Sequence, residues 1–448
     1  MAQVYMDHAA TTPLSVGALS AMTPFFTEIF GNASGVNPAG DRAARAVFAA
    51  RQEIAFMLDC APRDIVFTSG ATEADNQAIL TGVTYAREHR GFGPNGRGEA
   101  NGRGEANERG ETNGRGETDG RGRTDGHDKS NGRGRSDGRC LTGQIMHMIT
   151  TEFEHPAVLR PLEALEAAGQ IALTKLHPGP SGVITEELLE DALTPETVFV
   201  SIMAVNNEVG TIQPIQKLVD VVRRYEAAGI TKMTGGDQRR ILFHTDATQA
   251  MATLLVDVNQ WGVDLVSFSA HKFNGPKGVG ALIARGMAPT PLILGGEQER
   301  GHRAGTLNVP GIIGMQKALE ESRLAFRERA DAVRALGTRL ADGLSAIDGV
   351  ALTVHPADRV PGIVHVTLED GDGALMVTQL GRLGISASAG SACQAGAVVE
   401  SDVMQALDVA ENRRRGALRF SLGHENTEAD VDAAIAAVRE VVETRGEK

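Results

Sequence analysis

Short apolar segments alternate with longer stretches of helical periodicity over most of the chain, and this alternation restricts the possible folds more than any other feature. The apolar segments are nearly continuous in Val, Ile, Leu, Met and Phe. Such strands are buried on both faces, which is typical of a mainly parallel sheet covered by helices on both sides. We predict strands over residues 65–68, 144–150, 172–176, 198–205, 241–245 and 265–268, and helices over 16–26, 41–58, 73–86, 156–168, 185–192 and 215–228.

Polar side chains follow five of these strands, at the point where each strand ends. In sheets of this kind, ligands bind beyond the carboxyl ends of the strands. The clusters are Thr72, His155, Asn206-Asn207-Glu208, Asp246 with Gln249, and Lys272. The sequence therefore predicts that these side chains surround one binding site.

Lys272 ends an apolar run and precedes a Gly/Pro-rich turn, in the stretch 267–280. We expect a poorly hydrated amine at a strand end. Desolvation disfavours the ammonium form, which makes the amine available as a nucleophile toward an aldehyde. On the tetrapeptide Ser269-Ala270-His271-Lys272 alone, a surface lysine or an ion-pair partner is the simpler interpretation.

The polar clusters together have the residue types that hold pyridoxal phosphate. An aspartate can pair with a protonated ring nitrogen, a glutamine can donate to a phenolic oxygen, hydroxyls can bind a phosphate, and a histidine can stack on the ring. The candidates are Asp246, Gln249, Ser269, Thr72, His155 and Lys272. Singly, each has a simpler explanation, such as a helix cap for the turn at 69–72 or for Asp246. Their convergence at successive strand ends favours the cofactor.

Residues 91–140 differ from the rest of the chain, because they repeat hexads such as Asn-Gly-Arg-Gly-Glu-Ala. No Val, Ile, Leu, Met or aromatic residue occurs between Phe92 and Leu141. We therefore interpret this segment as a solvated, disordered insertion. A weak RNA-binding arm and a calcium-binding repeat are alternatives, but balanced charge, missing aromatic residues and the absence of a Gly-Gly-x-Gly-x-Asp period count against them.

The net charge of −13 and the three cysteines restrict the partners and the compartment. An acidic chain is not expected to bind nucleic acid directly or an anionic membrane surface. Cys60, Cys140 and Cys393 have no CxxC or metal-ligand spacing, which indicates a reducing compartment and no metal site. With no secretory signal pattern and no apolar run of membrane length, we expect a cytoplasmic protein.

Several motifs closely resemble the cysteine desulfurases of the class V aminotransferase family. They are Tyr-x-Asp-His-Ala-Ala-Thr-Thr-Pro from Tyr5, Phe-Thr-Ser-Gly-Ala-Thr-Glu from Phe67, Val-Asn-Asn-Glu from Val205, His-Thr-Asp-Ala-Thr-Gln from His244, Ser-Ala-His-Lys from Ser269, Arg-Ala-Gly-Thr from Arg303 and Gly-Ser-Ala-Cys from Gly390. The resemblance covers nearly everything except residues 91–140. It implies a fold type I pyridoxal phosphate enzyme, with an α/β fold built on a mainly parallel seven-stranded sheet flanked by helices, and a smaller α/β C-terminal domain.

The resemblance also implies roles for individual residues. Lys272 would bond the cofactor covalently, Asp246 would hold its ring nitrogen, Gln249 and Asn207 would lie near its ring hydroxyl, and His155 would stack over the ring. Phosphate contacts would come from Ala71, Thr72, Ser269 and His271, with Thr306 reaching in from the second subunit of a homodimer. Asn32 and Arg419 fall where the family binds the substrate carboxylate.

Cys393 decides the expected reaction. It lies in a loop of small residues, 386–396. A mobile, exposed thiol is suited to entering an active site and then carrying a transferred atom out of it. We expect its thiolate to take sulfur from L-cysteine after Lys272 has moved the Cα proton, leaving alanine and a persulfide for an acceptor protein in iron-sulfur cluster assembly or tRNA thiolation. Ala389 and the segment 394–396 depart from the family pattern, which affects the expected loop motion and acceptor preference.

We expect two domains. Residues 15–300 would form the large cofactor-binding domain, and residues 1–14 with 301–448 would form the small domain that carries the cysteine loop. Within the small domain, Thr427 and Asp430 resemble a capping box for the last helix. The alternatives are a related class V enzyme, such as a selenocysteine lyase, an aminotransferase or an epimerase, and a sulfur-relay or scaffold protein without catalysis.

Overall fold

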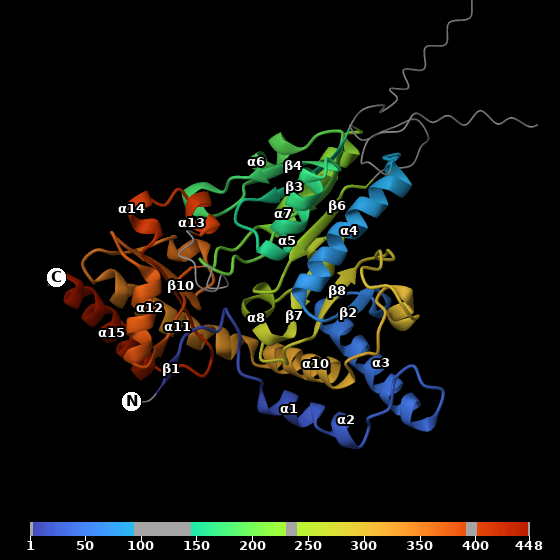
Figure 1. The fold of residues 1–448 in the computed structure, drawn as a ribbon, viewed down its shortest axis with the longest axis horizontal. Coiled ribbons are helices and arrows are strands. Elements are labelled where there is room, and N and C mark those ends of the chain that lie inside the picture. The colour runs from blue at the N-terminus through green and yellow to red at the C-terminus, as the bar shows by residue number, and fades with distance from the viewer. Residues whose placement is uncertain (1–2, 94–144, 230–239, 391–400, 447–448) are drawn as a thin grey trace, which may run out of the picture.

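A computed structural model describes residues 3–93, 145–229, 240–390 and 401–446 (Figure 1). Most of the insertion at 91–140, together with Cys140 and Cys393, lies outside the described residues. The described chain is elongated, with a large sheet toward one end and a smaller one toward the other.

The larger, central sheet has seven strands in the order β2-β8-β7-β6-β5-β3-β4. Their bounds are β2 Ile65–Thr68, β8 Gly280–Ala284, β7 Leu265–Ser269, β6 Leu242–Asp246, β5 Thr197–Ser201, β3 Met146–Thr151 and β4 Ile171–Leu176. All neighbouring pairs are parallel except those of β8, which runs antiparallel to both β2 and β7. The predicted fold class, a mainly parallel seven-stranded sheet flanked by helices, is confirmed.

Helices cover both faces of the central sheet. Helices α4 (Ala71–Arg90) and α5 (Pro156–Ala167) pack on one face, and α3 (Pro38–Leu58), α6 (Glu186–Ala192), α7 (Ile215–Ala227) and α10 (Val309–Leu324) pack on the other. Small residues recur every four positions on α4. They let the helix approach the sheet so closely that a Cβ at Gly82 would lie 2.5 Å from Cδ2 of Phe199.

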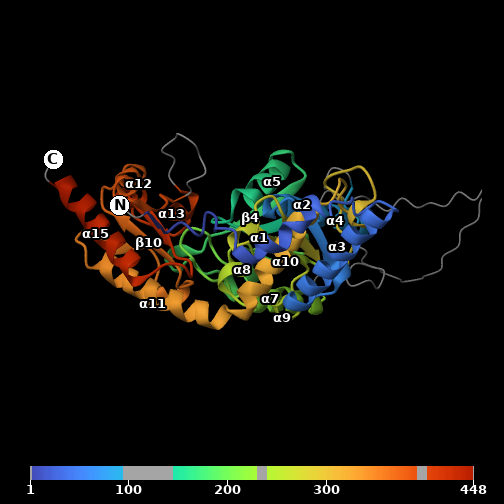
Figure 2. The same ribbon diagram turned by 90° about the horizontal axis from the view of Figure 1, so that it is seen from below.

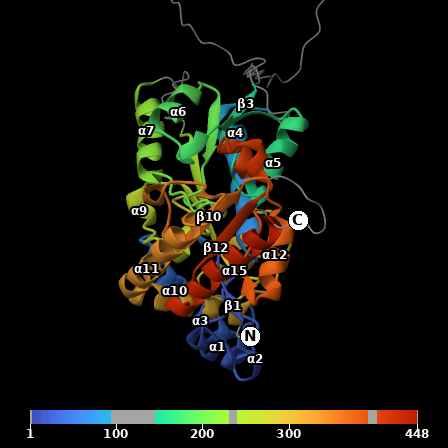
Figure 3. The same ribbon diagram turned by 90° about the vertical axis from the view of Figure 1, so that its left-hand side faces the viewer.

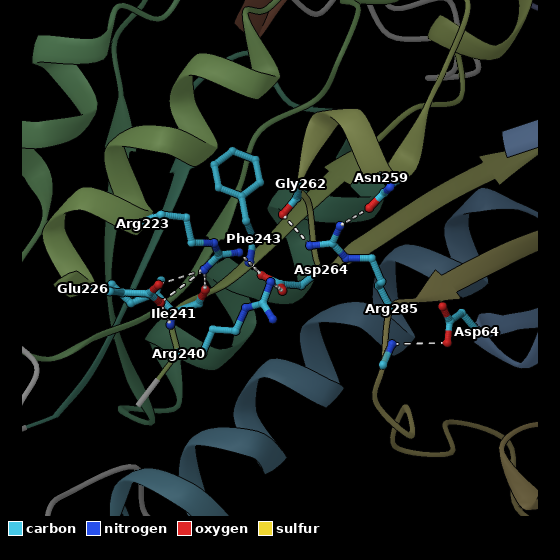
Figure 4. A network of polar contacts seen from close by, with 11 residues as sticks. Asp64, Arg223, Glu226, Arg240, Ile241, Phe243, Asn259, Gly262, Asp264 and Arg285 are labelled. Atoms are coloured by element: carbon cyan, nitrogen blue, oxygen red, sulfur yellow. Dashed lines mark hydrogen bonds and ion pairs between the residues drawn. The ribbon is translucent and has the colours of Figure 1, made fainter. Parts of the chain in front are cut away.

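A cluster of polar contacts closes the central sheet at the edge where β6 and β7 begin (Figure 4). Asp264, which is fully buried, accepts from Phe243 N at 2.8 Å and from Arg223 Nη2 at 2.6 Å, and its other oxygen lies 2.5 Å from Arg240 Nη2. These bonds satisfy strand-end groups without leaving the carboxylate unpaired. The functional side chains lie at the opposite edge of the sheet, where the parallel strands have their carboxyl ends.

The smaller, C-terminal sheet has three antiparallel strands, β12 (Ala417–Ser421), β10 (Ile363–Leu368) and β9 (Val350–Leu352). Helices α11 (Phe326–Ser345), α12 (Gly373–Arg382) and α15 (Glu428–Gly446) share an apolar cluster with it. Figure 3 shows this part end-on, and Figure 2 shows α10 and α11 leading to it from the central sheet.

The predicted capping box at the start of α15 is confirmed. Asp430 N donates to Thr427 Oγ1 at 3.2 Å, and Thr427 N donates to an Asp430 carboxyl oxygen at 2.9 Å. The helix then buries Val431, Ala434 and Val438 on one face. Local sequence and tertiary packing therefore specify the same helix.

The N-terminal segment connects the two sheets. Strand β1 (Val4–Tyr5) pairs with β11 (Ile385–Ser386), and Asp7 bridges to Ser421 of β12. Further along, Thr12 donates through both its main-chain N and its hydroxyl to the carbonyl of His271, which follows β7. The first dozen residues therefore run from the C-terminal sheet to the carboxyl edge of the central sheet.

The remaining helices are short: α1 Val16–Met22, α2 Pro24–Thr27, α8 Ala250–Thr253, α9 Val258–Trp261, α13 Asp402–Ala406 and α14 Glu411–Arg414. The helix predicted over 16–26 is divided into α1 and α2 at Pro24, which has no N–H to donate into the preceding turn. Among the described residues, no helix combines the length and the apolar character that a membrane span needs.

The division into two domains remains our prediction. The apolar cluster of the C-terminal sheet includes Leu336 and Leu340 of α11, whereas Met315 and Leu319 of α10 belong to a cluster of the central sheet. We now propose a boundary near Ala325, between these helices, instead of residue 300.

Candidate active site

Lys272 lies directly beyond the carboxyl end of β7, in a single 3₁₀ turn, Ala270–Lys272. Its Nζ donates to the carbonyls of Ala9 at 2.5 Å and Ala10 at 2.9 Å. Both carbonyls belong to the N-terminal segment, so the amine is held by main-chain acceptors at the carboxyl edge of the sheet, where the sequence predicted it.

Asp246 is the last residue of β6, the strand next to β7, and Gln249 follows it. Both side chains are almost completely buried. Asp246 Oδ1 accepts from Thr248 N at 2.8 Å, and Gln249 Nε2 donates to Ala9 O at 2.8 Å. The Ala9 carbonyl thus accepts hydrogen bonds from both Gln249 and Lys272, which brings together residues that follow two adjacent strands.

His155 caps the first turn of α5, where its Nδ1 accepts from Ala157 N at 3.1 Å. Burial lowers the pKa of His155, and the positive charge of Lys272 adds to this, while the carboxylate of Asp246 opposes it. The ring is therefore neutral near pH 7 and within electrostatic reach of both residues. It also lines an open cavity of about 500 Å³, together with Thr72, Asn76 and Arg160.

The turn between β2 and α4 has the features of a phosphate site. Gly70 is the N-cap of α4, and no side chain caps the helix there. A twenty-residue helix with uncapped N–H groups at Ala71 and Thr72 attracts an anion. The start of β8 crowds the turn, because a Cβ at Gly280 would lie 2.8 Å from Gly70 Cα.

Ser269 and His271 complete this turn from the end of β7. A Cβ at Gly70 would lie 3.6 Å from Ser269 Oγ, so the hydroxyl is adjacent to the start of α4. His271 Nδ1 lies 3.1 Å from Thr11 Oγ1. Burial, reinforced by the positive charges of Lys272 and Lys277, lowers the pKa of His271 to about 4, so the imidazole is neutral near pH 7.

Two buried acidic residues surround Asp246 and were not singled out in the sequence. Asp75 of α4 lies 3.5 Å from His244 Nε2, and Glu154 accepts from Met203 N at 2.5 Å. Burial raises the pKa values of Asp75 and Glu154, and the negative charge of Asp246 adds to both shifts. Acidic residues beside a helix start are usually solvated, and no sequence signal distinguishes these two.

Arg419 lies in β12 of the C-terminal sheet, next to the N-terminal segment. Its Nη2 donates to Asp7 Oδ1 at 2.6 Å and to Ser388 Oγ at 3.1 Å, and its Nη1 donates to Asn207 O at 2.9 Å. The guanidinium is thus fixed between the two sheets, and Asn207, predicted for the site, contacts it through its main chain. Asp7 was part of a recognised motif, but its pairing with Arg419 was not predicted.

Three predicted site residues are not brought together with the others. Asn32 is exposed, and in the described chain its hydrogen bonds are local, to Ser34 and Gly35. Thr306 is also exposed. It follows Arg303, whose side chain pairs with Glu73 of α4 at 2.9 Å. Cys393 lies outside the described residues.

Comparison with known proteins identifies the family. The sequence pattern described as "Aminotransferase class-V" matches residues 4–91 and 142–434. The chain belongs to the class V aminotransferase family. The two matched segments leave out the hexad repeats, in agreement with the interpretation of residues 91–140 as an insertion.

The relatives of this class V aminotransferase family member include cysteine desulfurases. The cysteine desulfurase IscS of Methanosarcina thermophila is 35% identical over 441 residues, 98% of this chain and 92% of that protein. The cysteine desulfurase of Cereibacter sphaeroides is 34% identical over 446 residues, 99% of this chain and 96% of that protein.

Solved structures support the same family. A structure titled "NIFS-LIKE PROTEIN" is 29% identical with a TM-score of 0.78, and covers 99% of this chain and 100% of its own. DndA from Streptomyces lividans is 29% identical with a TM-score of 0.68, covering 94% and 99%. Class V aminotransferase family enzymes depend on pyridoxal phosphate, so the predicted cofactor is confirmed, as is the predicted family.

Proposed function

We propose that this chain is a cysteine desulfurase, a sulfurtransferase that converts L-cysteine to L-alanine and leaves the sulfur as a persulfide on Cys393. The observation that carries the proposal is Lys272 at the carboxyl edge of the central sheet, beside Asp246, Gln249 and His155, in a chain whose near full-length relatives are cysteine desulfurases.

The described residues fit pyridoxal phosphate. The uncapped start of α4 and the adjacent Ser269 hydroxyl form a cradle for the phosphate. Asp246, buried at a strand end and without a basic ion-pair partner among the described residues, suits a protonated ring nitrogen. When bound, the cofactor draws electrons away from the substrate Cα, so that the Cα proton can be removed.

Each site residue then has a role in binding or proton transfer. Phosphate would be held by Ala71, Thr72, Ser269 and His271, and the ring by Asp246, Gln249, Asn207 and His155. Lys272 would hold the cofactor, and its Nζ, which the carbonyls of Ala9 and Ala10 orient, would move the proton at Cα. The neutral imidazole of His155 adds no positive charge beside the ring.

The substrate carboxylate would bind Arg419, because a guanidinium with a fixed plane suits bidentate recognition of a carboxylate. Asp7, Ser388 and the Asn207 carbonyl fix that plane. We also propose Asn32 as a carboxylate ligand. Its exposed loop would reach a neighbouring site only in an assembly of two chains.

Sulfur transfer requires a thiolate, and we assign it to Cys393. Its sulfur attacks the sulfur of the bound cysteine, so that an S–S bond forms as the substrate C–S bond breaks. The carbon that loses sulfur gains a proton and leaves as L-alanine. The sum, L-cysteine and a thiol giving L-alanine and a persulfide, needs no external oxidant or reductant.

A homodimer is part of the proposal. Apolar side chains are exposed along α1, α2 and α3 and the loop between α2 and α3: Val16, Leu19, Phe26, Phe30, Val36, Phe48 and Phe56. An exposed apolar surface of this kind is typical of an interface. A second copy there would bury these side chains and would allow Thr306 to contact the partner's phosphate turn.

The persulfide would pass to an acceptor protein for iron-sulfur cluster assembly or tRNA thiolation. We propose a cytoplasmic location, because a reducing compartment keeps the Cys393 thiol free. The acidic net charge of −13 supports protein acceptors over direct contact with nucleic acid.

The test is to incubate the purified holoenzyme with L-cysteine and measure alanine, sulfide and protein-bound persulfide. Cys393→Ala should abolish persulfide and sulfide and leave the cofactor absorbance intact. Cys60→Ala is the matched control, because burial raises the pKa of the Cys60 thiol to about 12 and makes it unreactive. Full sulfide release by Cys393→Ala would refute the role of Cys393. An aminotransferase would give the same rates with and without this thiol.

A further inference from the structure

A second cavity of the described residues is lined mainly by parts of the chain that have no role in the reaction proposed above. It has a volume of about 630 Å³ and lies between α8, α11, residues 356–363 and residues 421–425. Of the predicted site residues, only Gln249 and Lys272 line it, while Asp246, His155, Ser269 and Arg419 do not. We call it the rear cavity. The segment Ala9–Thr12 borders it and also contacts the site residues.

The wall of the rear cavity is mainly apolar. Phe273 follows the 3₁₀ turn after β7, Leu254 follows α8, Phe326 and Val333 come from α11, and Ile363 begins β10. Cavities of about 300–1,000 Å³ with apolar walls and a few polar groups are the usual form of small-molecule sites. The volume and the lining therefore suit a ligand of that size.

The charged groups of the rear cavity are predominantly positive. Three arginines line it, Arg329, Arg334 and Arg359, against two carboxylates, Asp342 and Glu425. Glu425 is partly engaged, with one oxygen 3.3 Å from His424 Nδ1 and the other 3.4 Å from Asn274 Nδ2. The chain as a whole has a net charge of −13, so an excess of cationic side chains in one cavity differs from the composition of the whole molecule.

Arg359 is the most unusual of these groups. It is only 4% exposed, and its Nη1 donates to three main-chain carbonyls, those of Val360, Pro361 and Ile363. Its Nε has no hydrogen-bond partner in the described chain. Burial lowers the pKa of Arg359, and no carboxylate opposes that shift. A buried cation without a counter-charge is costly, and a bound anion would remove that cost.

We propose that the rear cavity binds a small organic anion with an apolar body, such as an aryl-alkyl carboxylate. The carboxylate would face the arginines, and the apolar body would lie against Phe273 and Phe326. This site is separate from the substrate site at Arg419 and does not depend on the proposed desulfurase reaction.

Binding would also affect the arrangement of the two sheets. The walls come from α8 and Phe273 on the side of the central sheet, and from α11 and Leu422 on the side of the C-terminal sheet. A ligand that contacts both sides stabilises the folded arrangement increasingly as its free concentration rises above its Kd. Ala9, whose carbonyl accepts from Lys272 and Gln249, lines the same cavity, so a bound ligand would lie beside the residues that hold the catalytic amine.

The experiment is isothermal titration calorimetry of the holoenzyme with 4-phenylbutyrate, and with its neutral amide as the comparison ligand. We expect saturable binding of the carboxylate and at least about tenfold weaker binding of the amide, because the charged group is lost. Arg329→Gln should weaken carboxylate binding about tenfold. Arg327→Gln is the matched control, because Arg327 is exposed on the same helix and does not line the cavity.

Two further variants distinguish the rear cavity from the substrate site. Ala330→Trp, at a lining position of α11, should abolish binding by filling the cavity. Arg419→Gln should leave binding unchanged. The proposal is overturned if 4-phenylbutyrate fails to bind, if Arg329→Gln binds as the unmodified chain does, or if Arg419→Gln removes binding.

Discussion

Glu299→Ala should destabilise the protein strongly, because Glu299 compensates a buried charge. Arg51 of α3 donates to both Glu299 carboxyl oxygens, at 3.0 and 2.5 Å, and to Ile65 O at 2.6 Å. The side chains of Arg51 and Glu299 are 10% and 1% exposed. Glu299 also accepts from Phe67 N at 2.9 Å, and the Arg51 guanidinium lies 4.4 Å from the Phe67 ring centroid.

The magnitude follows from the groups that the substitution leaves unpaired. Removing one partner of a buried ion pair costs about 3–5 kcal/mol, because the other charge stays in the interior. The Phe67 N–H also loses its acceptor, which costs about 1–3 kcal/mol for a buried donor. The two terms share one site and do not add simply, so we expect a total loss of about 4 kcal/mol.

Urea unfolding of the holoenzyme, followed by circular dichroism, measures this loss. The double variant Arg51→Met/Glu299→Leu should be less destabilised than Glu299→Ala, because it leaves no unpaired charge in the interior and only the Phe67 N–H without a partner. Asp432→Ala removes an exposed ion pair with Arg339 and should have little effect. A loss below about 1 kcal/mol for Glu299→Ala, or a double variant less stable than the single one, would refute the reasoning.

Three further predictions concern other parts of the molecule. Arg419→Lys should raise the KM for L-cysteine about tenfold or more without changing the cofactor absorbance, since an ammonium group cannot keep the planar contacts of the guanidinium; unchanged steady-state kinetics would contradict this. Asp75→Asn should be more stable than the unmodified chain near pH 8, but not near pH 4. Burial raises the folded-state pKa of Asp75, so the carboxyl group costs stability only above its unfolded pKa of about 3.9. Equal urea midpoints of the two proteins at pH 8 would contradict this. Thr427→Ala should cost about 1 kcal/mol in urea unfolding through the lost helix cap, and Thr427→Ser should restore most of it.

The central sheet could be predicted from the sequence because its parallel strands are apolar throughout. Strand β8 was not predicted, because it begins at Gly280, directly after the glycine-rich turn that follows Lys272. The prediction also extended β5 to Val205, whereas it ends at Ser201. Residues 202–205 are apolar because they are buried beyond the end of the strand. Apolar character alone cannot distinguish a buried strand from a buried segment that follows it.

The candidate site was predictable where it follows strand ends, and not where it depends on tertiary contact. Asp246 ends a strand, and Gln249 and Lys272 lie just beyond strand ends, so their convergence follows from the sheet topology. The pairing of Asp7 with Arg419 joins residues 412 positions apart, and no local pattern encodes it. The fully buried Asp75 of α4 was missed for a different reason, since an acidic residue within a helix is normally solvated.

The path of the N-terminal segment has a consequence for synthesis. Residues 4–12 are translated before their partners, which are the turn after β7 and then β11 and β12, late in the described chain. Every strand of the central sheet is synthesised earlier and can assemble with its helices beforehand. Arg419 of β12, which pairs with Asp7, is made late, so the described site residues can come together only after residue 419 has been translated.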